Sequence, residues 1–222
     1  CSCVNSITVL HSAPATALHH LNASRSIRIL WLLEEIGVPY ELVQYKRSTT
    51  TNLAPESLKA IHPLGKSPVI EIDGQVIAES GAIVESIISK YAPHLAPSEG
   101  TPEHTDYLQW IHFSESSAML PFLLKVFNKH ELQTGTKLNF LTDYAETEFN
   151  KVFAYLNNHL EGKTFLVGNT LTGADFMLGF VVESALKNLN IDDKFLNISA
   201  YIKSLEGLDS HKRAMRIESQ LD

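Results

Sequence analysis

A run of turn and cap signals between residues 55 and 85 constrains the fold of this chain more than any other segment. Pro68 opens a short apolar run, and a proline there cannot donate a ladder hydrogen bond, so it belongs at the first residue of a strand or at a turn. Asp73 and Gly74 separate this run from a second apolar run and signal a hairpin. Ser80 precedes a run of helical period as an expected N-cap, where free backbone amides favour an anion. Together these signals predict a small site that holds an extended peptide and its carboxylate.

The first ninety residues alternate between strand and helix patterns. Apolar residues at helical spacing predict a helix at 26–36, and Gly37 supplies its C-terminal stop. Pattern alone indicates a mixed α/β domain. The expected order is a strand at 16–21, a helix at 26–36, a strand at 40–45, a polar loop at 46–54, a short helix with proline in its first turn at 55–61, the hairpin, and a helix at 80–91.

The second half of the chain has a helical period throughout. Residues 92–102 contain three prolines, a glycine and a serine, which is typical of a linker. Thr172 and Asp175 have the spacing of a capping box, with Asp in the place of Glu. One stripe of apolar residues follows helical spacing, at Phe149, Val152, Phe153, Leu156 and Leu160. We expect an extension at 1–15, an α/β domain at 16–92, a linker at 93–101 and an all-helical domain at 102–222.

Composition and charge exclude several classes of protein. The 222 residues are 44% hydrophobic and 19% charged, which is typical of a globular chain. A net charge of −7 without a basic cluster disfavours nucleic acid and anionic membranes, and no apolar run reaches the length of a membrane helix. Cys1 and Cys3 lie together and cannot staple a fold, so a reduced, cytoplasmic setting is expected.

Residues 7–10 of the extension fit either an added strand or a disordered lead.

The sequence NASRSIR, from Asn22 to Arg28, joins the first expected strand to the first helix. Together with the strand-opening proline and the Glu-Ser helix start at 79–80, it resembles the glutathione transferase family over nearly the whole chain from Thr16. The match is nearest to fungal and bacterial cytosolic members whose first helix reads Asn-x-Ser-Arg-Ser-x-Arg. The resemblance implies a thioredoxin-like N-terminal domain, an all-helical C-terminal domain, glutathione as the cosubstrate and no metal.

By this resemblance Ser24 donates a hydrogen bond to the glutathione sulfur. A free thiol has a pKa of about 8.5, so a hydroxyl donor and the positive end of a helix are needed to favour the thiolate near neutral pH. Ser24 lies just before the helix expected at 26–36, where both effects act. Asn22, through its side-chain amide, and Ser26 compete for this role. The local sequence also leaves open that Ser24 is only an N-cap.

The resemblance assigns five residues to glutathione. The backbone of Ser67, before a cis Pro68, pairs with the cysteinyl part of the ligand. Glu79 accepts the γ-glutamyl amine, and Ser80 holds the γ-glutamyl carboxylate at a helix N-terminus. Lys66 stands where the family places a residue near the glycyl carboxylate. From the sequence alone, a trans proline, a plain cap and solvated side chains are the alternatives.

Other positions are expected to support the fold. Arg28 matches a family arginine that supports the first helix, whereas Arg25 is either solvated or near enough to the helix start to reach an anion. Thr172 and Asp175 resemble a buried capping motif of the helical domain, with a role in folding. The histidines form no recognisable metal-ligand set and are expected to be structural or surface residues, namely His19, His20, His62 and His112.

A second, hydrophobic substrate is expected between the domains, against the first long helix of the helical domain. Apolar residues on such a helix usually form core, which is the alternative for each of them. The candidates are Trp110, Phe113, Glu115, Ser116, Met119 and Phe122.

The expected activity follows from what the resemblance implies and from what is absent near Ser24. No cysteine lies near Ser24 and no CxxC motif occurs, which disfavours mixed-disulfide chemistry. The resemblance implies a transferase that conjugates the glutathione thiolate to hydrophobic electrophiles, with peroxide reduction as a second activity. The alternative is a non-catalytic protein of the same fold that binds glutathione or apolar ligands and serves a regulatory partner. A homodimer is expected, without nucleic acid or membrane partners.

Overall fold

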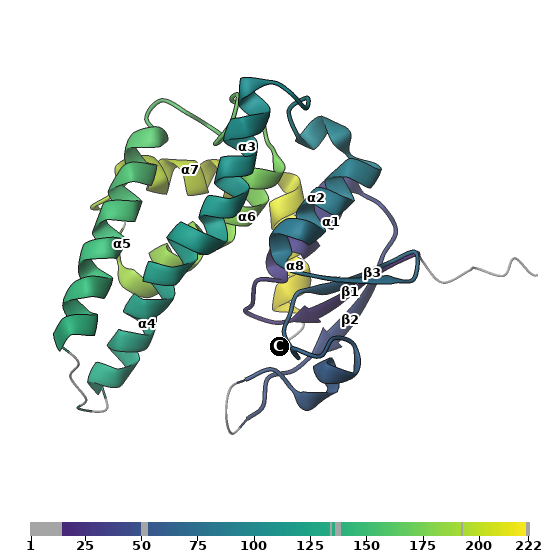
Figure 1. Ribbon diagram of the computed structural model, residues 1–222, viewed down its shortest axis with the longest axis horizontal. Helices are drawn as coiled ribbons and strands as arrows, with labels where there is room; N and C mark the ends of the chain where they lie inside the picture. Colours follow the sequence, from purple (N-terminus) through teal and green to yellow (C-terminus); the bar gives the residue numbers. More distant parts are fainter. Residues whose placement is uncertain (1–14, 50–52, 134, 136–138, 192, 221–222) are drawn as a thin grey trace, which may run out of the picture.

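The computed structural model describes residues 15–49, 53–133, 135, 139–191 and 193–220 (Figure 1). Apart from Ala15, the extension expected at 1–15 lies outside these residues. The described chain forms an α/β unit followed by a helical unit, and its last helix, α8 (Asp209–Ser219), returns to pack against the α/β unit (Figure 1). The predicted fold class is therefore confirmed, while the domain limits at 92 and 102 stay a prediction.

The sheet has four strands in the order β2-β1-β3-β4. The central strand β1 (Thr16–Leu21) pairs in parallel with β2 (Glu41–Tyr45) and antiparallel with β3 (Val69–Ile72). Strand β3 pairs antiparallel with β4 (Gln75–Ala78). Parallel strands need a crossover, which the helix between β1 and β2 supplies. β1 has the predicted bounds, and β2 begins one residue later than predicted.

The segment before β3 and the hairpin after it both follow the sequence signals. The Ser67–Pro68 peptide bond is cis, as the resemblance implied. Asp73 and Gly74 have φ values of 51° and 82°. Positive φ at both central residues is typical of the type I′ turn that joins two twisted strands, and Asp-Gly is a preferred pair for it. The hairpin prediction is therefore confirmed.

Two helices of the α/β unit begin and end close to the predicted residues. Helix α1 (Ile27–Ile36) ends at Gly37, whose φ of 72° confirms the expected stop. Helix α2 (Ser80–Tyr91) has Glu79 at its cap position and Ser80 as its first helical residue, so the prediction of Ser80 as N-cap was wrong. The reason is the tight junction with β4, which leaves a single residue to turn the chain. The short helix predicted at 55–61 is a 3₁₀ turn (Glu56–Ala60).

The helical unit begins with a long rod that contains one irregular turn. A 3₁₀ turn (Pro93–Leu95) precedes it, and a π-helical turn (Ser114–Ala118) interrupts it. The predicted stripe on α5 is confirmed, since four of its five residues are buried and Val152 is half-buried. The helices are α3 (Pro102–Phe113), α4 (Met119–Gln133), α5 (Asn139–His159), α6 (Gly173–Leu189) and α7 (Leu196–Glu206).

A continuous core holds the two units together. Trp31 of α1 donates from Nε1 to Ser210 Oγ of α8 at 3.1 Å, and its ring lies 4.5 Å from the ring of Phe176 on α6. At the start of α6, a Cβ on Gly173 would come within 2.6 Å of Tyr107 Oη, so only glycine permits this approach. These contacts join α6 and α8 to helix α1 of the α/β unit, and α3 to the start of α6.

The capping box at the start of α6 is present and becomes part of a larger buried network. The fully buried Asp175 carboxylate accepts the backbone N–H groups of Thr172 at 2.9 Å and Leu166 at 3.0 Å. It also accepts the hydroxyl of Tyr201 at 2.9 Å. Burial raises the pKa of Asp175 to about 6, and these hydrogen bonds oppose the rise. The predicted capping box is confirmed, and its role in folding stays a prediction.

Replacing Asp175 with Asn is expected to lower the free energy of unfolding by about 2 kcal/mol, because buried donors lose an acceptor. The loss should be larger in acid. A carboxyl whose pKa is raised in the folded state strengthens the fold below its unfolded pKa, and this contribution disappears as the pH rises through about 6. Urea unfolding of both proteins from pH 4 to 7 measures the difference. A difference that shrinks on acidification would contradict the raised pKa.

Candidate functional site

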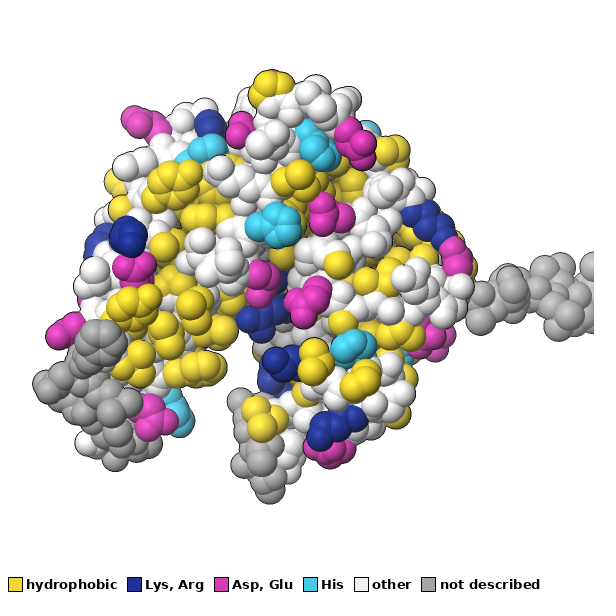
Figure 2. All heavy atoms as spheres, viewed as in Figure 1, with side chains coloured by type: hydrophobic (Ala, Val, Ile, Leu, Met, Phe, Trp, Pro, Cys, Tyr) yellow, Lys and Arg dark blue, Asp and Glu magenta, His cyan; other side chains and the backbone are white. Residues whose placement is uncertain are grey.

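The cleft between the α/β unit and the helical unit contains a pocket of about 210 Å³. In Figure 2, side chains of both charges gather at the centre of the molecule, beside the notch that separates the two units. The pocket receives side chains from the loop before α1, the segment before β3, the β4–α2 junction and the π-helical turn. Its lining residues are Arg25, His62, Leu64, Lys66, Ser67, Pro68, Ala78, Glu79, Ser80 and Glu115.

All five residues that the resemblance assigned to glutathione line this one pocket. Ser67 Oγ donates to the carbonyl oxygen of His19 at 3.0 Å, which fastens the segment before β3 to the central strand. Pro68 is buried, and Lys66 is exposed at the pocket's rim. Pro68, just before β3, and Ser80, at the start of α2, therefore line the same pocket.

The start of α2 forms the next wall of the pocket. Ser80 is buried at 4% exposure, and the exposed Glu79 has φ 70° and ψ 115°. A positive φ is strained for a residue with a side chain, and such strain persists where the surrounding structure enforces it. The first N–H groups of this twelve-residue helix have no partner within the helix and favour an anion. This wall can receive a carboxylate.

Arg25 and Glu115 also line the pocket, and the fully buried Arg28 supports Glu115 from within the protein. Arg25 Nε donates to both carboxylate oxygens of Glu115, at 3.1 and 3.2 Å. Arg28 Nη1 also donates to Glu115, and the Arg28 guanidinium lies 5.1 Å from the ring centre of Phe180. Burial lowers the pKa of the fully buried Arg28 to about 10, and Glu115 opposes this change. Arg28 thus stays charged at neutral pH and links α1 to the π-helical turn.

Ser24 lies in the loop between β1 and α1, one residue before the pocket-lining Arg25. The loop turns at Ala23, whose φ is 47°. The half-buried Ser24 accepts the backbone N–H of Ser26 at 3.2 Å, and the two hydroxyl oxygens are 2.9 Å apart. Ser26 occupies the cap position of α1 without a side-chain cap hydrogen bond, so a capping role for Ser24, which accepts the N–H of Ser26, stays open. Asn22 is half-buried in the same loop.

Five residues that the sequence did not assign to the site lie in it or beside it: His62, Leu64 and Ala78 line the pocket, and His20 and Glu218 contact the loop that carries Ser24. Ser26 Oγ lies 2.9 Å from Nδ1 of His20, and Nε2 of His20 lies 2.5 Å from Oε2 of Glu218. Glu218 Oε1 also accepts the backbone N–H of Ala23 at 2.7 Å. His20 had been expected to be structural or on the surface. No local pattern connects a glutamate of the last helix with a loop near residue 23, so the sequence carried no signal for this contact.

The six residues predicted for a second substrate do not share one surface. Glu115 lines the pocket, whereas Phe113 and Ser116 line a different hollow. The other three belong to the core and line neither hollow, with exposed fractions of 1%, 2% and 5%, so their role at a second substrate stays a prediction; they are Trp110, Met119 and Phe122.

The hollow beside Phe113 and Ser116 measures about 480 Å³ and lies between α4 and α5. Leu120 and Tyr155 on its rim are half exposed, and Figure 2 shows a hydrophobic patch over this part of the helical unit. An exposed apolar patch on a globular protein is typical of a binding surface.

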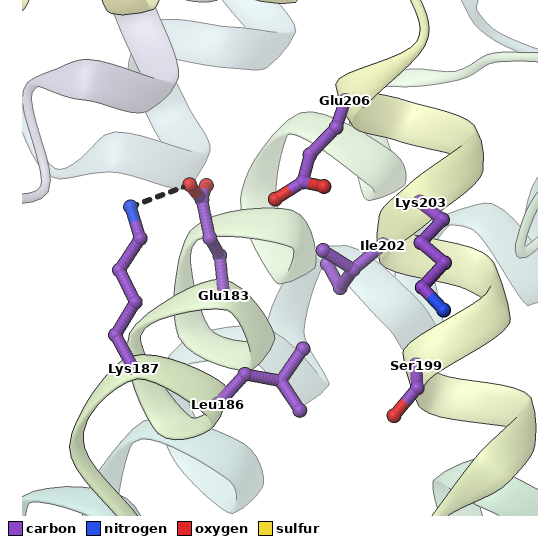
Figure 3. Close-up of a pocket in the computed structure, with 7 residues that line it drawn as sticks. All are labelled: Glu183, Leu186, Lys187, Ser199, Ile202, Lys203 and Glu206. Atoms are coloured by element: carbon purple, nitrogen blue, oxygen red, sulfur yellow. Dashed lines mark hydrogen bonds and ion pairs between the residues drawn. The ribbon is translucent and has the colours of Figure 1, made fainter. Parts of the chain in front are cut away.

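A further hollow, of about 250 Å³, lies between α6 and α7 (Figure 3). Lys187 reaches toward Glu183 across its edge and donates to the carboxylate at 2.7 Å (Figure 3). His211 Nε2 lies 3.4 Å from the same carboxylate. The charge of Glu183 is therefore compensated within the fold, which favours a structural role for this hollow.

The described residues contain neither a cluster of metal ligands nor a helix that could span a membrane. His, Cys, Asp and Glu side chains nowhere form a group of three that could hold a metal ion in that part of the chain. Its helices are too short or too polar to cross a membrane.

Comparison with known proteins supplies independent information. The family model "Glutathione S-transferase, N-terminal domain" matches residues 13–88, and "Glutathione S-transferase, C-terminal domain" matches residues 114–209. The chain is 34% identical to glutathione S-transferase 3 of Schizosaccharomyces pombe, over 91% of this chain and 86% of that protein. It is also 24% identical to elongation factor 1-gamma 1 of Oryza sativa, over 94% of this chain and 50% of that protein.

Solved structures agree with the fold. A glutathione S-transferase from Actinobacillus pleuropneumoniae is 35% identical and superimposes with a TM-score of 0.83, covering 92% of this chain and 93% of that one. A glutathione transferase from Phanerochaete chrysosporium, solved with oxidized glutathione, is 22% identical with a TM-score of 0.80, covering 95% and 98%. At that identity the second likeness shows the fold alone.

The buried ion pair in the cleft wall leads to a stability prediction. Glu115→Gln should lower the free energy of unfolding by about 3 kcal/mol, because it leaves the buried Arg28 guanidinium without its counter-charge. The double variant Arg28→Met with Glu115→Gln should recover most of this loss. Glu146→Gln, which breaks the exposed pair with Lys125, is the control and should cost less than about 1 kcal/mol. Urea unfolding measures these free energies, and an equal loss for Glu115→Gln and Glu146→Gln would contradict the prediction.

Proposed function

The chain belongs to the glutathione S-transferase family, and on that premise we propose that it binds glutathione in the cleft and transfers its thiolate to hydrophobic electrophiles. The observation that carries the proposal is the convergence of Lys66, Ser67, Pro68, Glu79 and Ser80 on a single pocket. These residues come from two separate segments of the α/β unit, and each has chemistry suited to one part of the tripeptide.

The proposed ligand lies extended between the segment before β3 and the start of α2. The backbone of Ser67 pairs with the cysteinyl unit, next to a proline that offers no competing N–H. The γ-glutamyl carboxylate meets Ser80 and the free amides of α2, and Glu79 accepts the γ-glutamyl amine. The exposed Lys66 lies near the glycyl carboxylate. Each charged end of the ligand thus meets a group of opposite sign or a helix N-terminus.

In the proposed reaction Ser24 donates its hydroxyl hydrogen to the sulfur and favours the thiolate. The sulfur then attacks an electrophilic carbon, a carbon–sulfur bond forms, and the leaving group departs with its electron pair. The cleft contributes by holding the two reactants together. Glu115 is the member of the predicted second-substrate set that lines the glutathione pocket, whereas Phe113 and Ser116 line the separate hollow between α4 and α5. Peroxide reduction by the same thiolate is the proposed second activity.

A non-catalytic binding protein is the second candidate function. The similarity to elongation factor 1-gamma 1 over 94% of this chain favours it. That relative is named as an elongation factor subunit and not as a transferase, and related sequences can differ in function. The two candidates differ in turnover, since both bind glutathione but only the transferase consumes it. A panel of electrophiles and peroxides separates them.

We place the chain with the fungal and bacterial cytosolic members that carry the first-helix motif, and we propose a cytoplasmic homodimer. In this dimer the α/β unit of one subunit lies against the helical unit of the other. The hydrophobic patch over α4 and α5 supports this arrangement, because it offers a surface for burial against a partner subunit.

Replacing Glu79 with Gln should weaken glutathione binding about tenfold or more, because a charge-assisted contact with the amine is lost. Isothermal titration calorimetry measures the affinity. Glu99→Gln, which changes an exposed carboxylate outside the pocket, is the control and should bind as the wild type does. A wild-type protein that does not bind glutathione would overturn the proposed function.

Replacing Ser24 with Ala should lower kcat/KM for conjugation about 100-fold, because one preorganised donor to the sulfur is removed. The affinity for glutathione should change little, since the other contacts remain. Ser204→Ala, on the exposed face of α7, is the matched control. Unchanged turnover in Ser24→Ala would refute the role of Ser24 and point to Asn22, and wild-type binding without turnover would favour the second candidate function.

A further inference from the structure

A chain of four side chains begins at Ser24, the residue before the pocket-lining Arg25, and runs into the protein. Ser24 Oγ lies 2.9 Å from Ser26 Oγ, which lies 2.9 Å from Nδ1 of His20. On the far side of the ring, Nε2 lies 2.5 Å from Oε2 of Glu218 on α8. The two links from Ser24 to Ser26 and from Ser26 to Nδ1 of His20 have hydrogen-bond distances, along which a proton can pass.

The inner part of the chain is shielded from water. Ser26 is 0% exposed and His20 is 1% exposed, whereas the Glu218 side chain is 15% exposed. Charged groups on the neighbouring elements have other partners. Arg28 of α1 pairs with Glu115, Glu71 of β3 pairs with His19, and Arg213 of α8 pairs with Glu34. The carboxylate that faces the His20 ring is therefore that of Glu218.

The positions of the hydrogen atoms follow from what each group can donate. With a neutral His20 that carries its hydrogen on Nε2, Nδ1 is an acceptor and receives the hydroxyl hydrogen of Ser26. Ser26 Oγ then accepts the backbone N–H of Leu21 at 3.2 Å and the hydroxyl hydrogen of Ser24. Ser24 Oγ keeps an acceptor site for a hydrogen that comes from the pocket. The carbonyl of Leu21, at 3.0 Å, is the competing acceptor for Ser26.

We propose that the thiol proton of bound glutathione passes through Ser24 and Ser26 to His20, and that Glu218 stabilises the resulting imidazolium. This inference rests on the proposed function. The thiol S–H bond breaks as its proton joins Ser24 Oγ, the former Ser24 hydrogen joins Ser26 Oγ, and the former Ser26 hydrogen joins Nδ1 of His20. No oxidant or further reactant is needed. The products are a thiolate and an imidazolium, so the net charge of the site is unchanged.

The chain reverses its direction once the proton has moved. Nδ1–H of His20 now donates to Ser26, Ser26 donates to Ser24, and Ser24 donates to the thiolate. The same transfer that removes the proton therefore leaves Ser24 as the donor that the thiolate needs. His20 and Glu218 act through the two serines, so they are positioning residues.

The contact between His20 and Glu218 favours the transferred state. Nε2 and Oε2 approach to 2.5 Å without the alignment of a hydrogen bond, so the contact is mainly electrostatic. A positive ring next to a buried carboxylate gains from such an approach much more than a neutral ring does. Glu218 also accepts the N–H of Ala23 and so fixes the turn that carries Ser24. The last helix thereby sets both the charge and the geometry of the site.

The test compares the thiolate formed with the protons released when glutathione binds. It is run at about pH 8, where an ordinary imidazole is neutral. Ultraviolet difference absorbance counts the thiolate formed on binding, and calorimetry in buffers of different ionisation enthalpy counts the protons released. S-methylglutathione has no thiol, so the number of protons released when it binds measures the contribution of all other groups, and this number is subtracted. The wild type should release far less than about one proton per thiolate formed, because the proton stays in the protein.

Glu218→Gln keeps an oxygen for the N–H of Ala23 but removes the charge that stabilises the imidazolium. This variant should bind S-methylglutathione as the wild type does. With glutathione it should either form about tenfold less thiolate or release about one proton to the solvent for each thiolate formed. Glu71→Gln is the matched control, because it breaks the His19–Glu71 pair on the opposite face of β1 and should behave as the wild type.

A wild type that releases about one proton per thiolate overturns the relay but leaves the proposed function intact. A Glu218→Gln variant with the same thiolate and the same proton count as the wild type overturns the relay as well. Absence of glutathione binding in the wild type overturns the proposed function, and the relay with it. The number of protons that the wild type releases per thiolate formed tests the relay even if Glu218→Gln fails to fold.

Discussion

The contact on which the site depends is the ion pair between Arg28 of α1 and Glu115 of the π-helical turn. A fully buried guanidinium is costly unless a carboxylate meets it, so this pair requires that α1 and the long rod of the helical unit hold a fixed relation. Arg25, the neighbour of Ser24 in the chain, shares the same carboxylate. The pair therefore holds together the two walls of the cleft and restrains the loop that carries the candidate catalytic serine.

Helix α8 completes this arrangement from the other side of α1. Trp31 connects α1 with both α6 and α8, and Glu218 near the end of α8 reaches the loop at Ala23. The loop between β1 and α1 is thus held by contacts from the π-helical turn and from the last helix. A reactive group on a short loop gains precision when rigid elements restrain that loop. The helical unit contributes to the site through these contacts as well as through any surface for a second substrate.

Local sequence signals predicted much of the fold, because turns and caps depend on a few neighbouring residues. Gly37, the Asp73–Gly74 hairpin and the capping box of Asp175 all lie where such signals placed them. The cap of α2 fell one residue earlier than expected, at Glu79, because this is the single residue between β4 and α2. The cis bond before Pro68 came from the family resemblance, since proline alone does not specify it.

Contacts between distant residues could not be predicted in this way. Trp110 and Phe113 are three residues apart on one helix, yet the first is buried in the core and the second lines a hollow. Helical spacing groups such residues without saying which element covers them. The contacts of Glu115 with two arginines and of Glu218 with His20 span many residues along the chain, and no periodicity carries that information. The five residues that the resemblance assigned to glutathione line the pocket, whereas its other lining residues, such as His62 and Leu64, and its supporting charges were not predicted.

The central claim is that the cleft binds glutathione and favours its thiolate. An ultraviolet difference titration of the glutathione complex of the wild-type protein, followed from acid to alkaline pH, tests it most directly. The account predicts that bound thiolate appears well below the pKa of about 8.5 of a free thiol. A bound ligand whose thiol titrates at the free value would contradict the claim and identify a carrier rather than a transferase.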